Sequence, residues 1–337
     1  NSDFTENKIR GKSHTDGAAI YNSGTISKIS NSTFSSNEAI SDMGQGRGGA
    51  ISNFGTITEI TNSTFSNNKA VSENNSAIGG AILNIGTLSI INSDFINNSA
   101  TSGVTARGGA IYANAETSII SDNYNMKFSG NTTQTGNEEK EYNAIYVSTG
   151  AQLNLSVINN GNITFDDSIN GNTFLLNIDG DKSGKIYLNN EISNATNIEV
   201  NKTAMILNKG KYGQGKFNDN PNLSLANAEL HIANGYLEEL SLGEYSANNS
   251  ILHLDVNPDT MTSDLLTVNG DVKGVTNLII YATSDTDIVD KGRILFAQST
   301  EDTTGNKNSF AVSRVYKSPY LYDVKYANIA TNSNEWY

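Results

Sequence analysis

The chain is built around a two-part motif that returns at a nearly fixed interval. One copy opens with Gly-Gly-Ala-Ile at residues 48–51 and closes with Phe-Ser-Asn-Asn at residues 65–68. The alanine of the first part recurs at positions 19, 50, 81, 110 and 144, which are 31, 31, 29 and 34 residues apart. The phenylalanine of the second part recurs at positions 4, 34, 65, 95 and 128. A period of this size predicts a stacked array of similar units and not a closed globule.

The residues between the two parts favour strands. Short apolar runs containing Ile57, Ile60 and Phe65 alternate with polar residues and are separated by Gly and Asn. Stacked coils place equal residues about 4.8 Å apart, so that Ile lies on Ile, Phe lies on Phe and each Asn amide bonds the next. The Gly-Gly step suits a close passage of two backbones, and the Asn of Phe-x-x-Asn suits a bend.

We therefore predict an all-β fold, a right-handed parallel β-helix formed as a single-stranded solenoid with internal asparagine ladders. The alternative is a leucine-rich-type solenoid with helical returns. Connecting stretches such as residues 71–77 are rich in Asn and Ser and are unsuited to helix, which favours the β-helix.

Gly-Gly-Ala-Ile followed in register by Phe-x-x-Asn resembles the repeat of the polymorphic outer-membrane proteins, a group of type V autotransporters. The resemblance covers residues 4–146 in about five copies. The first copy has Gly-Ala-Ala at residues 17–19, the fourth lacks Asn-Ser-x before Phe128, and the last keeps only Asn-Ala-Ile-Tyr at residues 143–146. Atypical terminal repeats are usual in solenoids. The resemblance implies the passenger domain of an autotransporter.

Composition narrows the choice of partner. Only 36% of the 337 residues are hydrophobic, but the regular placing of Ile and Phe argues against disorder. The formal net charge of −13 disfavours nucleic acid and an anionic membrane surface as partners.

The absence of Cys is compatible with export. The sequence shows no signal peptide and no apolar run of membrane-spanning length. Because it begins within a repeat, we expect a fragment that contacts a membrane only through a C-terminal barrel outside it.

We expect three regions. Residues 1–146 form the β-helix with the two-part repeats, residues 147–250 form a β-helix of shorter period, and residues 251–337 form the last coils and a cap. Extra length in the first region falls into loops that should emerge on one side as a ragged polar edge: residues 41–47, 71–78 and 101–107. The charged cluster at residues 137–141 is expected to be a solvated loop tip.

The last region resembles the autochaperone cap of autotransporter passengers. Its terminal Trp-Tyr resembles the point where the passenger gives way to a linker helix and membrane barrel. An open solenoid end exposes apolar rungs and unpaired strand edges, so a cover is needed. The aromatic residues that suit a β-hairpin cap are Tyr316, Tyr320, Tyr322, Tyr326 and Trp336.

The three histidines do not suggest a catalytic triad. His231 and His253 alternate with apolar neighbours, so we expect both to face outward from strands; His14 lies in the first repeat. A Ser-His-Asp triad needs a base held by an acid beside an exposed Ser, and no Gly-x-Ser-x-Gly elbow stands out.

Paired carboxylates matter because β-helices also host polysaccharide hydrolases and lyases. The candidate acid and base pairs are Asp166 with Asp167, Asp179 with Asp181, and Asp285 with Asp287. Glycosidases also use aromatic platforms, and lyases usually add Arg or Lys. The only arginines in the second half of the chain are Arg293 and Arg314, both within the expected cap. Such Asp positions are commoner as turn residues.

Two loops have features of ligand sites. Asp179 and Asp181 occupy the first and third places of a sequence that resembles an EF-hand calcium loop, but Asn190 stands at the twelfth place and Glu191 comes one residue late. Residues 209–217 are the only local basic patch, and a cationic loop with aromatic residues could contact an anionic glycan. For both loops we favour a plain turn over a ligand site.

The predicted function is binding and not catalysis, with no catalytic residue, cofactor or metal. We expect a passenger displayed at the bacterial outer membrane or released from it. It would act as an adhesin for a host receptor, matrix or glycan, or for another copy of itself, through avidity along a polar rod. The alternatives are a secreted effector that engages a host receptor and a polysaccharide-degrading enzyme.

Overall fold

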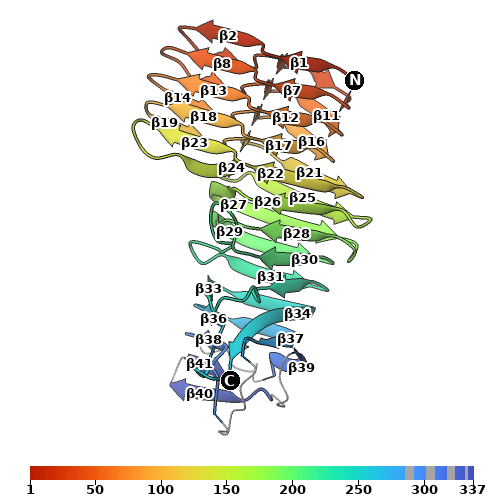
Figure 1. The fold of residues 1–337 in the computed structure, drawn as a ribbon, viewed down its shortest axis with the longest axis vertical. Helices are drawn as coiled ribbons and strands as arrows, with labels where there is room; N and C mark the ends of the chain where they lie inside the picture. The colour runs from red at the N-terminus through yellow and green to blue at the C-terminus, as the bar shows by residue number, and fades with distance from the viewer. Residues whose placement is uncertain (285–291, 301–307, 317–322, 331–332) are drawn as a thin grey trace.

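The computed structural model describes residues 1–284, 292–300, 308–316, 323–330 and 333–337. In this part of the chain every regular element is a β-strand, and the strands stack as coils into a rod with the N-terminus at one end (Figure 1). Nearly all pairings between coils are parallel. The predicted all-β parallel β-helix is therefore confirmed.

One repeat forms one coil of five strands. They are β10 (Ile51–Asn53), β11 (Thr56–Thr61), β12 (Thr64–Ser66), β13 (Lys69–Ser72) and β14 (Ser76–Ile78). Each strand pairs in parallel with its counterpart in the next coil: β15 (Ile82–Asn84), β16 (Thr87–Ile91), β17 (Asp94–Ile96), β18 (Ser99–Ser102) and β19 (Thr105–Arg107).

The coils on either side continue these columns. The preceding strands are β1 (Asp3–Thr5), β2 (Lys8–Gly11), β3 (Thr15–Asp16), β4 (Ile20–Asn22), β5 (Thr25–Ile26), β6 (Ile29–Ser30), β7 (Thr33–Ser35), β8 (Glu38–Ser41) and β9 (Gly46–Arg47). The following strands are β20 (Ile111–Ala113), β21 (Thr117–Asp122), β22 (Asn125–Ser129), β23 (Thr132–Thr135), β24 (Glu141–Val147), β25 (Gln152–Ile158) and β26 (Asn162–Phe165).

The phenylalanines of the repeat form one continuous stack inside the rod. Neighbouring rings lie 4.6–4.9 Å apart between centroids, with planes within 15° of each other. The stack runs one coil beyond the predicted repeats, because Phe165 pairs with Phe128. The members are Phe4, Phe34, Phe65, Phe95, Phe128 and Phe165.

The longer of two internal asparagine ladders runs beside this stack. Each side-chain Nδ2 donates to the Oδ1 of the next coil at 2.8–2.9 Å, and each backbone N–H donates to the same oxygen at 3.0–3.1 Å. The second Nδ2 hydrogen goes to a Phe carbonyl one coil back, as from Asn68 to Phe34 at 2.9 Å. The members are Asn7, Asn37, Asn68, Asn98 and Asn131.

A second, shorter ladder joins Asn22, Asn53 and Asn84 through 2.8 Å bonds and ends on the Thr117 hydroxyl at 3.0 Å. The predicted ladders are thus confirmed. The bend, however, lies one residue earlier than predicted: the ladder residue Asn68 is regular, and the preceding Asn67 takes the left-handed conformation with φ of 57°.

The Gly-Gly step allows the backbones to approach closely. A Cβ added at Gly80 would lie 2.0 Å from the Gly109 carbonyl oxygen and 2.5 Å from the Ser99 carbonyl carbon, closer than any side chain tolerates. Gly79 beside it has φ of 66°. Both glycines are therefore needed for the turn that carries the chain from one coil to the next.

The extra length of the repeats is ordered, which corrects the expectation of a ragged edge. The loops do emerge on one side, but they pair as the four-stranded sheet β3-β9-β14-β19 (Figure 1). A small buried cluster of Ala70, Ala77 and Ala100 supports this sheet. Side chains as small as Ala let the added strands lie close to the coil. Residues 137–141 are exposed, as predicted for a loop tip.

Beyond residue 147 the coils are shorter and mostly aliphatic inside. Hydrogen-bonded partners in adjacent coils lie 22–25 residues apart, against 30–33 in the first repeats. The strands are β27 (Ser168–Gly180), β28 (Lys185–Leu188), β29 (Ile192–Asn201), β30 (Ala204–Leu207), β31 (Asn222–Ala226), β32 (Glu229–His231), β33 (Glu239–Leu242), β34 (Tyr245–Asn257), β35 (Thr262–Ser263), β36 (Leu265–Val268) and β37 (Val272–Ala282).

The chain ends in antiparallel pairing. The last strands are β38 (Ala297–Ser299), β39 (Phe310–Tyr316), β40 (Tyr326–Ala330) and β41 (Ser333–Trp336). β41 pairs antiparallel with β38 and with β40, and Trp336 is buried between Phe310 and Tyr326 at 5.3 and 5.5 Å. An antiparallel pair is thus present where a hairpin was predicted. The likeness to an autochaperone stays a prediction, and Tyr320 and Tyr322 lie outside the described residues.

Candidate functional site

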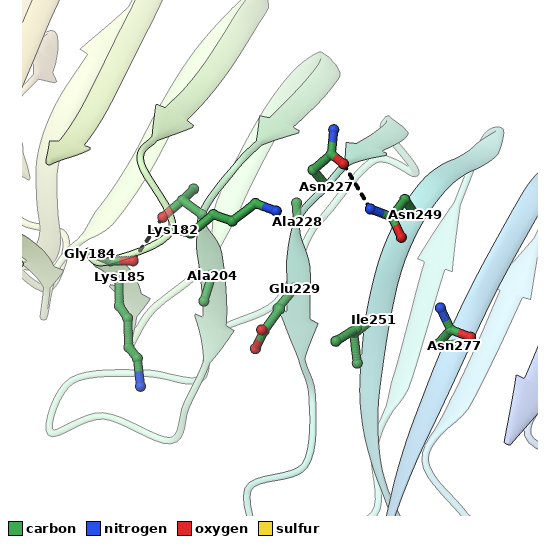
Figure 2. Close-up of a pocket in the computed structure, with 11 residues that line it drawn as sticks. Lys182, Gly184, Lys185, Ala204, Asn227, Ala228, Glu229, Asn249, Ile251 and Asn277 are labelled. Carbon is green, nitrogen blue, oxygen red and sulfur yellow. Dashed lines mark hydrogen bonds between the residues drawn. The ribbon is translucent and has the colours of Figure 1, made fainter. Parts of the chain in front are cut away.

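A polar pocket of about 260 Å³ opens on the side of the shorter coils. Its walls come from the segment before β28 and from β30, β32, β34 and β37, so it spans several coils (Figure 2). The side chains that give it its chemistry are Lys182, Lys185, Asn227, Glu229, Asn249 and Asn277.

The shape of the pocket follows from the corners of the coils. Lys182, Asn227 and Asn249 all have positive φ, at 72°, 51° and 48°, so the chain turns sharply at each. Asn249 donates from Nδ2 to Asn227 Oδ1 at 2.9 Å, which aligns two amides along the wall (Figure 2). Two ammonium groups, several amides and one carboxylate suit a hydroxyl-rich or anionic ligand. No lining residue is aromatic.

Glu229 connects this pocket to a stack of two histidines. Its Oε2 lies 3.0 Å from His231 Nε2 and 3.2 Å from His253 Nε2. The two rings are parallel within 12°, with centroids 3.6 Å apart. Hydrogen bonds from both histidines hold the pKa of Glu229 well below its usual value of 4.5, against partial burial. Burial in turn lowers the pKa of His231.

Both histidines face outward from their strands as expected, but the outward face is covered at this point. They do alternate with the buried Leu230 and Leu252, but His253 is only 5% exposed. The stack and the Tyr281 ring beyond it, 6.0 Å from His253, cover this face. The coil spacing could have revealed the pair, because Glu-Leu-His at 229–231 and Ile-Leu-His at 251–253 occupy the same register.

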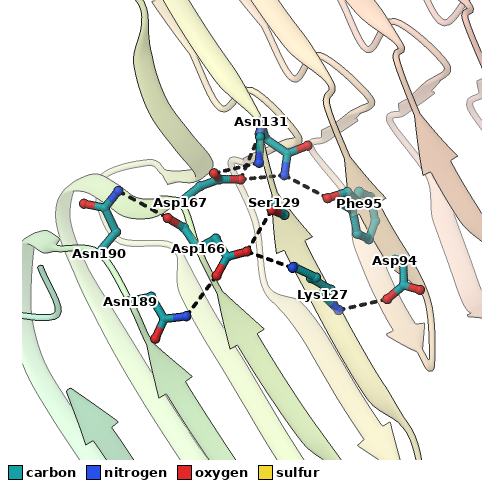
Figure 3. A network of polar contacts seen from close by, with 10 residues as sticks. Asp94, Phe95, Lys127, Ser129, Asn131, Asp166, Asp167, Asn189 and Asn190 are labelled. Atoms are coloured by element: carbon teal, nitrogen blue, oxygen red, sulfur yellow. Dashed lines mark hydrogen bonds and ion pairs between the residues drawn. The ribbon is translucent and has the colours of Figure 1, made fainter. Parts of the chain in front are cut away.

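Asp166 and Asp167 lie in a polar network at the junction between long and short coils (Figure 3). Asp166 accepts hydrogen bonds from Ser129 Oγ at 2.8 Å and Asn189 Nδ2 at 2.9 Å, and pairs with Lys127 Nζ at 3.0 Å. Partial burial raises the pKa of Asp166, but these three partners outweigh it and hold the pKa below the usual 3.8.

Asp167 ends the longer asparagine ladder. It accepts from Asn131 Nδ2 and the Asn131 backbone N–H, both at 2.8 Å, and from the Gly130 N–H at 2.9 Å. The side chain is 1% exposed, and this burial raises its pKa to about 6 in spite of the hydrogen bonds. A general acid and a general base need carboxyl groups with different pKa values, and Asp166 and Asp167 differ in this way. Asp167, however, lies inside the rod, where a polysaccharide does not reach.

The other candidate carboxylates are placed as turn and strand residues. Asp179 is exposed on β27 and accepts from Asn201 Nδ2 at 2.9 Å. Asp181 accepts from the backbone N–H groups of Asn159 and Ser183 at 2.8 and 2.9 Å, and the first of these bonds does most to lower its pKa. Asn190, at the twelfth place of the calcium-like loop, contacts the Asp166 carbonyl instead, at 3.4 Å. Asp285 and Asp287 lie outside the described residues.

The basic segment at residues 209–217 is not a simple surface turn. Phe217 is 6% exposed and bridges Ile192 in the core. Tyr212 stacks on Tyr142 with centroids 3.8 Å apart, so the segment reaches back to the long coils. Lys211 lies 4.8 Å above the Tyr212 ring. The cation and its ring remain at the surface, where contact with an anionic glycan stays a prediction.

The fold defines a class: a parallel β-helix whose coils carry Gly-Gly-Ala-Ile and Phe-x-x-Asn in register. The family model of the Chlamydia polymorphic membrane protein repeat matches residues 92–114, which run from the end of β16 to just past β20. The chain thus carries a repeat of this autotransporter family, and the predicted resemblance is confirmed. The match supports a location at the bacterial cell surface. A search of curated proteins found no match to the chain.

The described residues contain no helix with the length and apolar character that a membrane span requires.

Proposed function

We propose that the chain is the passenger of an autotransporter and that it acts as an adhesin. The observation that carries the proposal is the register of the long coils, which repeats the same polar side chain at one surface position. Thr25, Thr56 and Thr87 form one such column, with the outer two exposed. A column of this kind offers equal donors and acceptors about every 4.8 Å, so weak bonds add up along the rod.

The charged side chains of the long coils favour polar over ionic contacts with a partner. Lys28, close to the column, pairs with Glu59 at 2.8 Å, and Lys8 on another face pairs with Glu38 at 2.6 Å, in both cases between neighbouring coils. These Lys and Glu side chains already have ionic partners within the rod. We propose a host receptor, matrix or glycan as the partner, which the passenger reaches from the cell surface or after release from it.

Adhesion can be tested with beads coated with the purified chain and offered to host cells. Replacing Thr25, Thr56 and Thr87 together by Glu should reduce bead binding at least fivefold, because each change adds unpaired charge to the column. The matched control replaces Asn154, Asn177 and Glu199 on the shorter coils by Ala, Ala and Gln. Binding that is unchanged by the first variant, or absent in the wild type, would count against adhesion through this face.

Self-association and catalysis are separable outcomes. Sedimentation of the purified chain reports self-association directly. A screen for cleavage of neutral and anionic polysaccharides, repeated with Asp166→Asn and Asp167→Asn, tests an enzyme. Turnover that both substitutions abolish would replace the adhesin proposal by a hydrolase or lyase.

A further inference from the structure

Glu229, His231 and His253 bring three metal-binding side chains to one point on the outside of the rod. Glu229 and His231 are two residues apart on β32 and therefore share a face. His253 on β34 pairs directly with His231. Ligand atoms of all three residues lie within 4.8 Å of one another. In the described part of the chain this is the one group of three such residues with that geometry.

The donor set and its spacing fit zinc. Imidazole nitrogen and carboxylate oxygen are preferred zinc ligands, and two His with one Glu is a known three-ligand set that leaves a position for water. Bonds of about 2.0–2.1 Å at tetrahedral angles place ligand atoms about 3.3 Å apart. Glu229 Oε2 is 3.0 Å from His231 Nε2 and 3.2 Å from His253 Nε2.

The surroundings hold the ligands in place and leave a way in. Tyr281 Oη lies 3.1 Å from His253 Nδ1, so that a proton shared there leaves Nε2 free for a metal. The two imidazole rings are stacked within 12° of each other, so each ring must tilt toward Glu229 for both Nε2 lone pairs to point at one ion. The Glu229 side chain is 44% exposed and lines the open pocket, which gives an ion a path from solvent.

We propose that Glu229, His231 and His253 bind a divalent transition-metal ion of the zinc type that joins the coil of β32 to the coil of β34. The proposal departs from the sequence-based expectation of no metal. Lys185 opposes it electrostatically, because its ammonium group lines the same pocket as Glu229. Removing that charge should therefore tighten binding.

The test uses the whole chain without a histidine tag. Titration with Zn²⁺ should show one ion per chain and a rise in the unfolding midpoint, and Co²⁺ should give the visible absorption of a tetrahedral nitrogen and oxygen site. His253→Gln and Glu229→Gln should each weaken Zn²⁺ binding more than tenfold. Tyr281→Phe should weaken it about tenfold, as loss of an outer partner does. Lys185→Gln should strengthen it severalfold.

His14→Gln is the matched control, because His14 lies on the first coils and accepts a hydrogen bond from the Gln45 N–H. It should leave Zn²⁺ binding unchanged. Glu229→Gln keeps the shape of a half-exposed side chain, so the test does not depend on a buried substitution being tolerated. No saturable Zn²⁺ binding, or binding that His253→Gln and Glu229→Gln both leave intact, would overturn the proposal.

Discussion

The long coils of residues 1–146 and the short coils that follow use asparagine in opposite ways. In the long coils the amides are inside, and Asn53, Asn68 and Asn98 are fully buried. In the short coils the amides bond on the outside, as Asn177 does with Asn154 at 3.0 Å, while Leu and Ile fill the interior. The same parallel backbone therefore supports two kinds of interior, one with buried amides and one mainly aliphatic.

Coil length explains the difference. A coil of five strands has more corners, and each corner leaves backbone groups turned inward that need partners. A buried amide supplies two donors and an acceptor at such a point, as Asn68 does for Phe34 O and Asn37 N. The short coils contain long strands such as β27 and β34, whose backbone groups are paired in the sheet. Their interior is filled mostly by aliphatic side chains.

The sharpest test of this comparison replaces one amide in each region. Asn68→Leu removes the acceptor of two Asn37 donors and the donor to Phe34 O, each costing about 1–3 kcal/mol when buried. We expect a loss of about 3–5 kcal/mol of unfolding free energy, measured by denaturant titration. Asn177→Leu, the same change on the outside, should cost less than about 1 kcal/mol. Equal losses would remove the distinction between the regions.

The junction between the regions should respond to pH in two opposite ways. The pKa of Asp167 is raised by burial from 3.8 to about 6, so its contribution to stability is complete below about pH 4 and is lost as pH rises through 6. The loss amounts to at most about 3 kcal/mol. Asp167→Asn should remove this dependence of the unfolding free energy on pH between about 4 and 6. Thermal melts of the variant and the wild type across this pH range measure the difference.

Asp166 provides the control of opposite sign. Its pKa is lowered, so its contribution is present above pH 3.8 and is lost as pH falls through the folded-state value. Asp166→Asn should therefore remove stability at neutral pH and change little under acid conditions. Slopes of the same sign for both variants would contradict the assigned contacts.

The aromatic stack should be more sensitive within the long coils than at their end. Phe95 has a stacked ring on both sides, whereas Phe165 stacks on Phe128 and is followed in register by Leu188. Each aromatic pair adds about 0.5–1.5 kcal/mol beyond burial. Phe95→Leu should cost about 1 kcal/mol more than Phe165→Leu in thermal unfolding. The reverse order would show that stacking contributes little here.

The smallest expected effect concerns the contact that spans the two regions. Tyr212→Ala removes the ring stacked on Tyr142 and should lower the unfolding free energy by about 1 kcal/mol. Lys211→Ala, which keeps both rings, should have about half that effect or less. If the two regions unfold separately in calorimetry, Tyr212→Ala should widen the gap between their transitions.

The columns were predictable from the sequence because a period of about 31 residues places like residues at one position of every coil. Phe65 and Asn68 needed no tertiary information. The ordered sheet β3-β9-β14-β19 was not predictable, because Gly46 and Arg47 carry no strand propensity and pair only once their coils are stacked. The metal-type cluster was missed for a related reason: His231 and His253 meet only when the shorter register is known.

The direction of the longer asparagine ladder bears on how such proteins change in length. Each ladder amide donates one Nδ2 hydrogen to the next coil toward the C-terminus, and Asp167, whose carboxylate only accepts, closes the series. The Asn of a duplicated coil inserted anywhere ahead of Asp167 would accept a hydrogen bond from the coil before it and donate one to the coil after it. No donor or acceptor of the ladder would be left without a partner. Gene-level expansion and contraction of the array can therefore proceed one coil at a time without redesign of either end.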